Sequence, residues 1–347
     1  MTARIFLKKG MEYMEIRKIQ MTGRSSFVLT LPKNWVDSLE IQKNDPLGVI
    51  IQSDGNLLIT KNISGEKIQR TKNIEVHQKT DPVFFYRMLI GIYIAGYNTI
   101  AISSKDRISG KIRECIKEFT NMLIGIEFVE ETDNKIILKD LLNPLEMTFA
   151  NSLKRMFVIA KSMHNKAIES LRTNNIALAA EVVQQDSDVD RLFWLIARQT
   201  NMIMQNVHLA QKMNTTIIEI IPHYHVGRII ERVADHAVRI SRNVEKVKEN
   251  QIETNIIDKI SIASDKAILV FTQSVGSFFS HDIMNANRII ESIHSLETDY
   301  SKINSEILDL PAGLAVLIRN ISDSIKRTGE YSADIAENVI NYEMMVT

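Results

Sequence analysis

The feature that most constrains the fold is a helical period that runs from Leu145 to the end of the chain. Apolar residues recur there at spacings of three and four, which is typical of amphipathic helices packed in bundles. Polar and proline breaks divide the region into six helices, predicted over residues 147–173, 175–211, 218–248, 255–280, 282–308 and 311–342. Six helices of this length predict two separate three-helix bundles, 146–250 and 251–347, built by internal duplication.

A motif shared by the two predicted bundles supports the duplication. In the third helix of each bundle an arginine, an acid and an asparagine recur at equal spacing: Arg232, Asp235 and Asn243 in the first, Arg327, Glu330 and Asn338 in the second. In the second helix of each bundle we match two acid-x-acid elements, Asp188–Asp190 and Glu297–Asp299. Both bundles are therefore predicted to place acids on a second and a third helix.

The first part of the chain has a different character. Residues 1–14 are predicted to be a flexible tail, and residues 15–62 to form short strands with a turn at Asp54–Gly55. So few short strands cannot bury both faces alone, so we expect a partner chain to complete this unit. Residues 70–145 alternate strands with helices, one of which begins at Asp81–Pro82. The fold class is therefore multidomain and mainly α, with a β domain and a small α/β domain before the helices.

Composition excludes several classes of protein. The 347 residues are 45% hydrophobic and 24% charged, which excludes a disordered chain. The single cysteine, Cys115, cannot form an internal disulfide or a multi-thiolate zinc site, and a reducing, cytoplasmic location is expected. No run approaches the roughly 20 apolar residues of a membrane span, so no membrane insertion is expected. The 42 basic and 42 acidic residues cancel, although residues 1–145 hold 21 basic and 17 acidic side chains.

Carboxylates on the predicted helices are candidate metal ligands. Glu231 and Asp235 lie one turn apart on one helix face, and Asp188 and Asp190 are expected to close the same site from the neighbouring helix. The corresponding acids of the second bundle are Glu330, Asp334, Glu297 and Asp299. Oxygen donors suit Mg, Mn or Fe, or Zn if His236 joins them. The alternative is a pair of solvated faces with Arg232, Lys326 and Arg327 as ion-pair partners.

The segment Glu231-Arg232-x-x-Asp235-His236-Ala237, inside a duplicated three-helix bundle, resembles the signature of the PhoU family of phosphate-uptake regulators. The resemblance covers both bundles and implies that an E-x-x-x-D pair on each third helix binds a multinuclear metal cluster. Glu231 and Asp235 are thereby implied as ligands of a divalent or trivalent metal ion. Lys326 departs from the pattern, since it occupies the place of the first acid in the second bundle.

The segment from Gly23 to Val36, with Leu-Pro-Lys at residues 31–33, resembles an AbrB/SpoVT swapped-hairpin domain. The resemblance implies a homodimer formed by exchanged hairpins and, in many members, DNA binding through basic loop residues. The candidate DNA-binding residues are Arg17, Lys18, Arg24 and Lys33. Residues 15–62 carry a net charge of only about +1, which favours little counterion release, so a purely dimerising module remains the alternative.

The combined features predict a cytoplasmic regulator of phosphate uptake that is not an enzyme. Its expected partners are a second copy of the chain, a phosphate ABC transporter or its signalling components, and DNA. The first alternative is a DNA-binding transcription regulator with the helical half as sensor. A metalloenzyme and a ligand-free scaffold are the others; Glu291-x-x-His294 supplies only half of a di-iron carboxylate motif. Cys115 and Trp194 are predicted to be packing residues.

Overall fold

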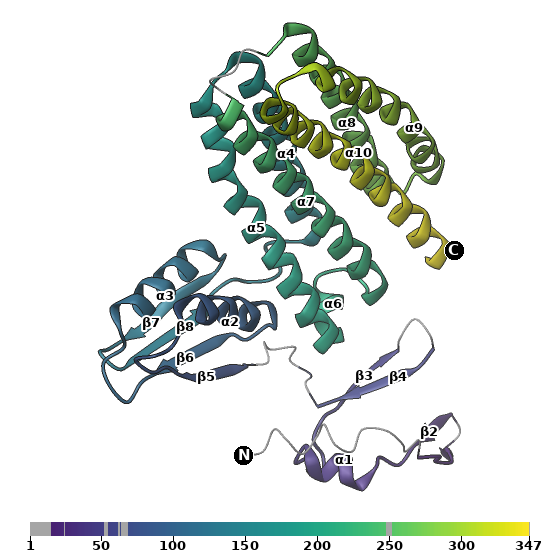
Figure 1. Cartoon of the computed structure of the whole chain (residues 1–347). Helices are drawn as coiled ribbons and strands as arrows, with labels where there is room; N and C mark the ends of the chain where they lie inside the picture. Colours follow the sequence, from purple (N-terminus) through teal and green to yellow (C-terminus); the bar gives the residue numbers. More distant parts are fainter. Residues whose placement is uncertain are drawn as a thin grey trace. The chain divides into compact units, whose positions relative to one another are not determined.

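The computed structural model describes residues 15–23, 25–51, 55–61, 63, 69–247 and 252–346. The chain divides into two compact units, Met1–Ile68 and Gln69–Thr347. In the first unit (purple in Figure 1), two antiparallel hairpins flank one short helix. These elements are β1 (Gln20–Thr22), β2 (Ser26–Val28), α1 (Lys33–Ser38), β3 (Gly48–Ile51) and β4 (Leu57–Thr60).

The first unit buries none of its described side chains. Ile16 is 89% exposed, Ile51 77% and Phe27 64%, although all three are large apolar residues. The predicted turn at Asp54–Gly55 falls partly outside the described residues, since Asp54 is not among them; Gly55 has a φ of 81°. A hydrophobic core is thus missing from the described part of this unit.

The second unit begins with a four-stranded sheet covered on one face by two helices (Figure 1). Its strand order is β5-β6-β8-β7, with β5 parallel to β6 and the other pairs antiparallel. The elements are β5 (Thr71–Glu75), α2 (Pro82–Ile94), β6 (Thr99–Ser103), α3 (Gly110–Met122), β7 (Ile126–Glu131) and β8 (Lys135–Asp140). The Asp81 carboxylate accepts hydrogen bonds from the Val83 and Phe84 amides, as the predicted N-cap requires.

Long helices form the rest of the second unit. They are α4 (Phe149–Thr173), α5 (Ile176–Gln205), α6 (Val207–Lys212), α7 (Ile217–Val247), α8 (Thr254–Ser280), α9 (Ile283–Glu306) and α10 (Ala312–Val346), with the 3-10 turn η1 (Ile307–Asp309). The helix predicted over 175–211 is broken at Asn206, whose backbone is extended. Asparagine ends helices readily because its side chain competes for backbone hydrogen bonds.

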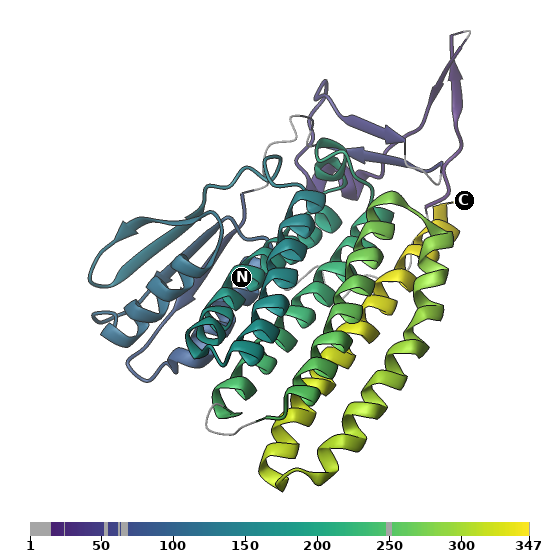
Figure 2. The same cartoon turned by 90° about the horizontal axis from the view of Figure 1, so that it is seen from above.

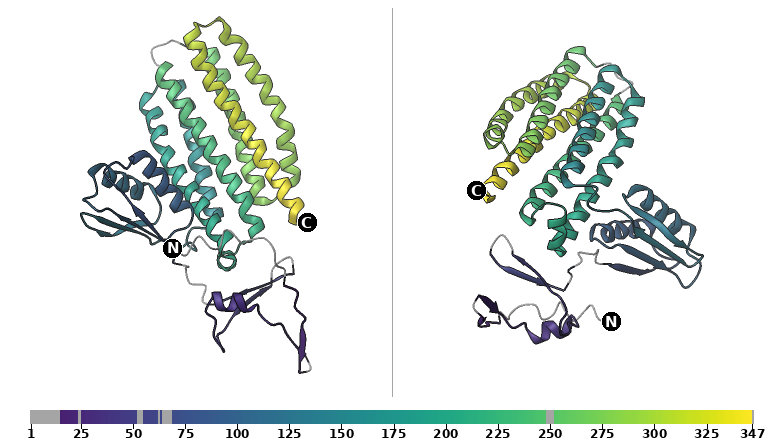
Figure 3. Two further views of the ribbon diagram at one scale, coloured as in Figure 1. Left: turned by 60° about the horizontal axis from the view of Figure 1, so that its bottom comes forward. Right: turned by 180° about the vertical axis from the view of Figure 1, so that it is seen from behind.

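The two three-helix bundles are continuous rather than separate, which corrects the expectation from the duplication. Helix α7 packs along α10, α4 contacts α8, and one hydrophobic core runs through both bundles. Figure 2 shows these helices side by side, and both views of Figure 3 show their long axes aligned. The repeated apolar stripes predict helices that pack, but an identical stripe in each repeat does not reveal that the repeats pack on each other.

Contacts between the bundles occur in pairs with the roles of the repeats exchanged. Asn243 on α7 meets Asn320 on α10 at 3.3 Å, while Asn338 on α10 meets His225 on α7 at 3.4 Å. A shift of 95 residues, as from Arg232 to Arg327, converts one pair into the other. The bundles are therefore related by a pseudo-two-fold axis between α7 and α10.

The turns between consecutive helices show which residues of the first two helices correspond in the two repeats. Helix α4 ends at left-handed Asn174 before the N-cap Asn175, and α8 ends at left-handed His281 before the N-cap Asp282. From Asn174 to His281 the shift is 107 residues, and this shift also superimposes each buried position of α9 on a buried position of α5. Asp190 is then equivalent to Glu297. The two acid-x-acid elements matched in the sequence are thus two residues out of register.

A buried arginine joins the α/β layer to the first bundle. Arg198 on α5 is 2% exposed and forms an ion pair with Asp140 at 2.8 Å. Its guanidinium also donates to the Tyr97 carbonyl at 2.9 Å and to the Tyr93 carbonyl, and it lies over the Tyr93 ring. Trp194 packs against both hydrophobic cores, as its predicted packing role requires. The sheet and α5 are consequently held as one body.

Candidate functional site

Four carboxylates of the first bundle face one another across two neighbouring helices. Glu231 and Asp235 lie one turn apart on α7, and Asp186 and Asp190 lie one turn apart on α5. The other three members all raise the pKa of Glu231, and Asp186 and Asp235 also raise that of Asp190. We call these four residues the acid cluster. It contains three of the sequence candidates and one residue, Asp186, that the sequence analysis missed.

Asp188 lies outside the acid cluster. Residues two apart on a helix point in directions about 200° apart, so Asp188 and Asp190 cannot both face α7. Asp188 instead pairs with Arg191 at 3.1 Å on the outer side of α5. The acid-x-acid pattern in the sequence predicted Asp188 as the second acid of α5 in the site. Asp186, which lies four residues before Asp190 and therefore on the same helix face, occupies that place instead.

Burial raises the pKa values across the acid cluster. Desolvation, followed by the Asp235 carboxylate, raises the pKa of Glu231 to about 7, with Arg228 opposing the shift. Desolvation, then Asp186 and Asp235, raises the pKa of Asp190 to about 6. Desolvation also raises the pKa values of Asp186 and Asp235, against neighbouring arginines. A cation among the four carboxylates would reverse this unfavourable crowding.

Glu231 is the innermost member, at 8% exposed. Its Oε1 accepts from Arg228 at 2.7 Å, while its Oε2 is buried without a hydrogen-bond partner. A buried carboxylate oxygen without a partner is costly unless a proton or a cation satisfies it. The donor chemistry and this unsatisfied oxygen fit a hard metal ion such as Mg²⁺ or Mn²⁺. As they stand, however, no three His, Cys, Asp or Glu side chains of the described residues converge closely enough to hold one.

The acids of the second bundle are mostly paired with bases. Glu330 pairs with Arg327 at 2.8 Å and with Lys326 at 3.4 Å, and Asp299 pairs with Lys266 and, at 3.8 Å, with Lys302. Glu297 is exposed and has only His294 nearby, at 3.6 Å. These acids therefore match the alternative of solvated, ion-paired faces more closely than a ligand set.

Asp334 differs from the other acids of the second bundle. Desolvation and then Glu337 raise the pKa of Asp334, with Arg232 opposing.

The second bundle has different residues at the positions equivalent to the acid cluster. Under the shift of 95 residues, Lys326 occupies the place of Glu231, and Glu330 occupies the place of Asp235. Under the shift of 107, Ile293 occupies the place of Asp186. The second bundle thus keeps two of the four carboxylates of the acid cluster.

The histidines near the acid cluster are engaged elsewhere. The ring of His236 lies 5.6 Å from that of Tyr331 on α10, and burial lowers the pKa of His236 to about 4. His223 contacts the Glu219 carbonyl through Nδ1 at 2.6 Å and packs on Phe278. Neither ring is drawn into the acid cluster, so oxygen is the donor type that the site offers.

The candidate DNA-binding residues lie in the first unit. Arg17 bonds to Glu15 at 3.0 Å and to the Thr30 hydroxyl at 3.1 Å. Lys18 and Lys33 are exposed, the latter as the first residue of α1. Arg24 lies outside the described residues. The structure therefore leaves two exposed lysines of the predicted set and places Arg17 in local contacts.

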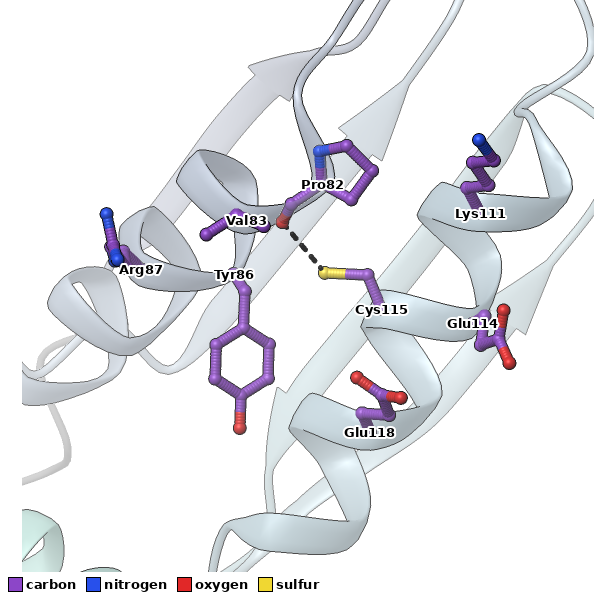
Figure 4. Close-up of a pocket in the computed structure, with 8 residues that line it drawn as sticks. All are labelled: Pro82, Val83, Tyr86, Arg87, Lys111, Glu114, Cys115 and Glu118. Atoms are coloured by element: carbon purple, nitrogen blue, oxygen red, sulfur yellow. Dashed lines mark hydrogen bonds between the residues drawn. The ribbon is translucent and has the colours of Figure 1, made fainter.

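A cavity of about 520 Å³ lies between α2 and α3 (Figure 4). Tyr86 and Cys115 border it, with the charged side chains of Arg87, Lys111 and Glu114 around its edge. The Cys115 thiol donates to the Pro82 carbonyl at 3.5 Å, and burial raises the pKa of this thiol to about 11. A thiol in this state is unreactive, in agreement with the predicted packing role of Cys115.

Comparisons with known proteins cover both units. Residues 153–244 match the family model described as PhoU domain, and residues 20–67 match that of antidote-toxin recognition MazE, bacterial antitoxin. A phosphate-specific transport system accessory protein PhoU homolog 1 from Thermotoga maritima is 24% identical over 196 residues, which cover 55% of this chain and 83% of the relative. A PhoU homolog from Aquifex aeolicus is 25% identical over 169 residues, covering 48% and 74%.

Two solved structures were also found to be similar. PhoU from Pseudomonas aeruginosa has a TM-score of 0.48 at 18% identity and covers 57% of this chain and 96% of its own. The phosphate transport system regulatory protein PhoU from Streptococcus pneumoniae has a TM-score of 0.46 at 18% identity, covering 58% and 94%. Among the described residues, no helix has the length and apolar character needed to cross a membrane.

Proposed function

We propose, from the premise that residues 153–244 are a PhoU domain and residues 20–67 a domain of the MazE antitoxin class, that this chain is an accessory regulator of phosphate transport. The role is regulatory rather than enzymatic and is exercised in the cytoplasm on a phosphate ABC transporter or its signalling components. The relatives from Thermotoga maritima and Aquifex aeolicus carry names of this kind.

The observation that carries the proposal is the acid cluster within the matched segment. Two carboxylates on α5 and two on α7 crowd together, and the Glu231 Oε2 is buried without a partner. We assign Asp186, Asp190, Glu231 and Asp235 as the ligands of one or more hard metal ions. When bound, such an ion supplies positive charge that relieves the repulsion among the four carboxylates and draws α5 and α7 together.

Metal occupancy then selects which surface of the first bundle is available to the transporter. Without the metal, the repelling carboxylates favour separation of α5 and α7, and with it they favour closure. A ligand can shift such an equilibrium only by the difference in its affinity for the two states, and four carboxylates that close around a divalent ion in one state only offer a large difference. The residues of the second bundle contribute less, because their acids are already paired with lysine and arginine.

The first unit is proposed to be completed by a second copy of the chain. It exposes Ile16, Phe27 and Ile51, and a patch of this kind on so small a unit is characteristic of an interface. A homodimer would bury these side chains against their counterparts. The exposed Lys18 and Lys33 favour a second candidate function, that of a DNA-binding transcription regulator, which predicts salt-dependent DNA binding that is lost in Lys18→Ala or Lys33→Ala.

Elemental analysis tests the metal assignment. The full-length chain, loaded with Mn²⁺ and then dialysed, is expected to retain metal, and Glu231→Gln or Asp235→Asn is expected to remove most of it. Glu330→Gln, at the position equivalent to Asp235, is the matched control and should retain the metal. The same proteins are then tested for binding to the purified transporter. Equal transporter binding by chelated and Mn²⁺-loaded protein would refute the regulatory mechanism.

A further inference from the structure

We propose that a cavity beside the acid cluster is a binding site for a phosphate-type oxyanion. The cavity has a volume of about 420 Å³ and lies where α5, α7 and α10 meet. Three of its lining residues are basic, Arg239, Arg242 and Lys246, and two are amides, Asn243 and Asn320. This inference deepens the proposed function and rests on it for its biological meaning, but binding itself requires neither metal nor transporter.

The three basic residues form a stripe along α7. Their spacing of three and four residues places them on one helix face, toward the cavity. Within the described part of the chain none of the three forms a salt bridge, although Arg242 lies near enough to Asp186 and Asp235 to lower the pKa of each. By contrast, Arg228, about three turns before Arg239 on the same helix, is held by Glu231 at 2.7 Å. The stripe is consequently available to a ligand that carries negative charge.

The pseudo-two-fold axis supplies an internal comparison. Under the shift of 95 residues, Arg239 corresponds to Asp334 and Arg242 to Glu337, while Lys246 corresponds to Asn341. Ten of the twelve buried positions of α10 match buried positions of α7 under the same shift, so the two helices have similar packing along this stretch. The helical scaffold therefore does not require arginine there, and the basic charge belongs to this one cavity.

Asn243 gives the cavity a fixed polar wall. It is 6% exposed, and its Nδ2 donates to the Arg239 carbonyl at 2.7 Å. Its Oδ1 accepts from Asn320 on α10 at 3.3 Å. Asn338 makes the same bond to the Asp334 carbonyl, at 2.7 Å, in the second repeat. The bond from asparagine to the carbonyl four residues earlier is thus common to both repeats, whereas His225 takes the place of Asn320 in the second and the charges around it differ.

The arrangement of charge identifies the class of ligand. Guanidinium groups bind the oxygens of a phosphate in pairs, and a lysine adds a point charge. Asp186 and Asp235 line the acidic end of the same cavity, so an anion is expected to bind toward Arg242 and Lys246. A divalent ion on the acid cluster would then lie beside the anion and strengthen its binding. The volume exceeds that of one phosphate group, so the phosphate can be inorganic or part of a nucleotide.

Calorimetric titration of the full-length, EDTA-treated chain tests the proposal, with inorganic phosphate and ATP as separate probes at low ionic strength. Saturable binding is expected, and Arg242→Glu or Arg239→Asp, which introduces the acid of the second repeat, should weaken it at least about tenfold. Arg242→Gln removes the charge without reversing it and should weaken binding less. Arg155→Glu, on an exposed position of α4, is the matched charge control and should bind like the unaltered chain.

Each outcome of the titration either supports or overturns the proposed oxyanion site. Tighter binding of inorganic phosphate than of ATP identifies free phosphate as the ligand, and the reverse order identifies a nucleotide; both support the site. Absence of saturable binding of both probes overturns it, and so does equal weakening by Arg155→Glu, since that would be a non-specific charge effect. Because the titration uses neither metal nor transporter, its failure leaves the metal-dependent regulator intact, and a failed metal assignment leaves this result intact.

Discussion

The two helical bundles share the same arrangement of helices but differ in how their charged side chains are paired. In the first bundle four carboxylates crowd together and their pKa values are raised despite neighbouring arginines, while three basic residues that form no salt bridge among the described residues line a cavity. In the second bundle Glu330 is paired with Lys326 and Arg327. Packing is largely preserved between the repeats because most buried apolar positions are needed for the core, whereas charge on the same scaffold is free to diverge. Function is therefore to be sought where the repeats differ.

The largest effect on the free energy of unfolding is expected at the ion pair of Arg198 and Asp140, which joins only the first bundle to the α/β layer. Arg198→Met removes the partner of Asp140 and leaves a buried carboxylate alone, which typically costs about 3–5 kcal/mol. The equivalent residue in the second bundle, under the shift of 107, is Ser305, which is exposed. Ser305→Ala should change the free energy of unfolding by less than about 0.5 kcal/mol. Urea denaturation compares the two variants, and similar losses would show that the junction is not specific to the first bundle.

The next effect is the pH dependence that Glu231 gives to the first bundle. Burial and Asp235 raise the pKa of Glu231 to about 7, above its ordinary value of 4.5, so the folded state holds this proton more tightly than the unfolded chain does. The free energy of unfolding therefore falls as pH rises from about 4.5 to about 7. Glu231→Gln removes this dependence and should be more stable than the unaltered chain by on the order of 2 kcal/mol at pH 8, with little difference at pH 4.

The measurement is denaturant unfolding in EDTA across this pH range, taken as the difference between variant and unaltered chain. A difference is needed because burial lowers the pKa values of His164 and His236 to about 4, and these residues contribute the opposite slope between about 4 and 6.5. Glu297→Gln, on the exposed face of α9, is the control and should retain the original slope. A pH-independent difference for Glu231→Gln would contradict the prediction.

A smaller effect is expected when the second bundle is converted toward the first. Lys326→Glu places two like charges one turn apart and removes the ion pair with Glu330, at a cost of about 0.5–1 kcal/mol in EDTA. Combined with Ile293→Asp it rebuilds four carboxylates, and Mn²⁺ should restore the lost stability and raise the metal content per chain. The checks are unfolding with and without Mn²⁺ and elemental analysis; no gain in metal would mean that carboxylates alone do not make the site.

The smallest effect distinguishes two neighbouring acids. Asp188→Asn breaks only a surface pair with Arg191 and should change stability by no more than about 0.5 kcal/mol, with metal retention unaltered. Asp186→Asn changes the same chemistry two residues earlier and is expected to reduce metal retention. Elemental analysis after dialysis compares them. Loss of metal with Asp188→Asn alone would restore the assignment made from the sequence pattern.

The sequence predicts the helices well, because their apolar period, asparagine breaks and caps are local features. Predicted boundaries agree with the structure within a few residues, and Asp81 caps α2 as expected. The packing of α7 on α10 could not be predicted, since it depends on which stripe faces which. The repeat register failed for α9 because an acid-x-acid pair is a weak marker, and only the left-handed residues Asn174 and His281 fix the alignment.

The candidate site was predicted in part. Glu231 and Asp235 were found because a spacing of four is visible in the sequence, and the same rule applied to Asp190 would have found Asp186. The stripe of Arg239, Arg242 and Lys246 was overlooked, since basic residues on a helix usually belong to a solvated face. Only the cavity and the comparison with Asp334 and Glu337 identify those three residues as a candidate anion site.

The junction at Arg198 has a mechanical consequence. Helix α5 carries Asp190 and, eight residues later at a rise of about 1.5 Å per residue, the guanidinium that is locked into the α/β layer. The same helix thus carries the carboxylates and, about 12 Å further along its axis, the arginine that is bound to the sheet layer. A metal-dependent shift of α5, as proposed above, would therefore also move the sheet, because one continuous helix connects the two places.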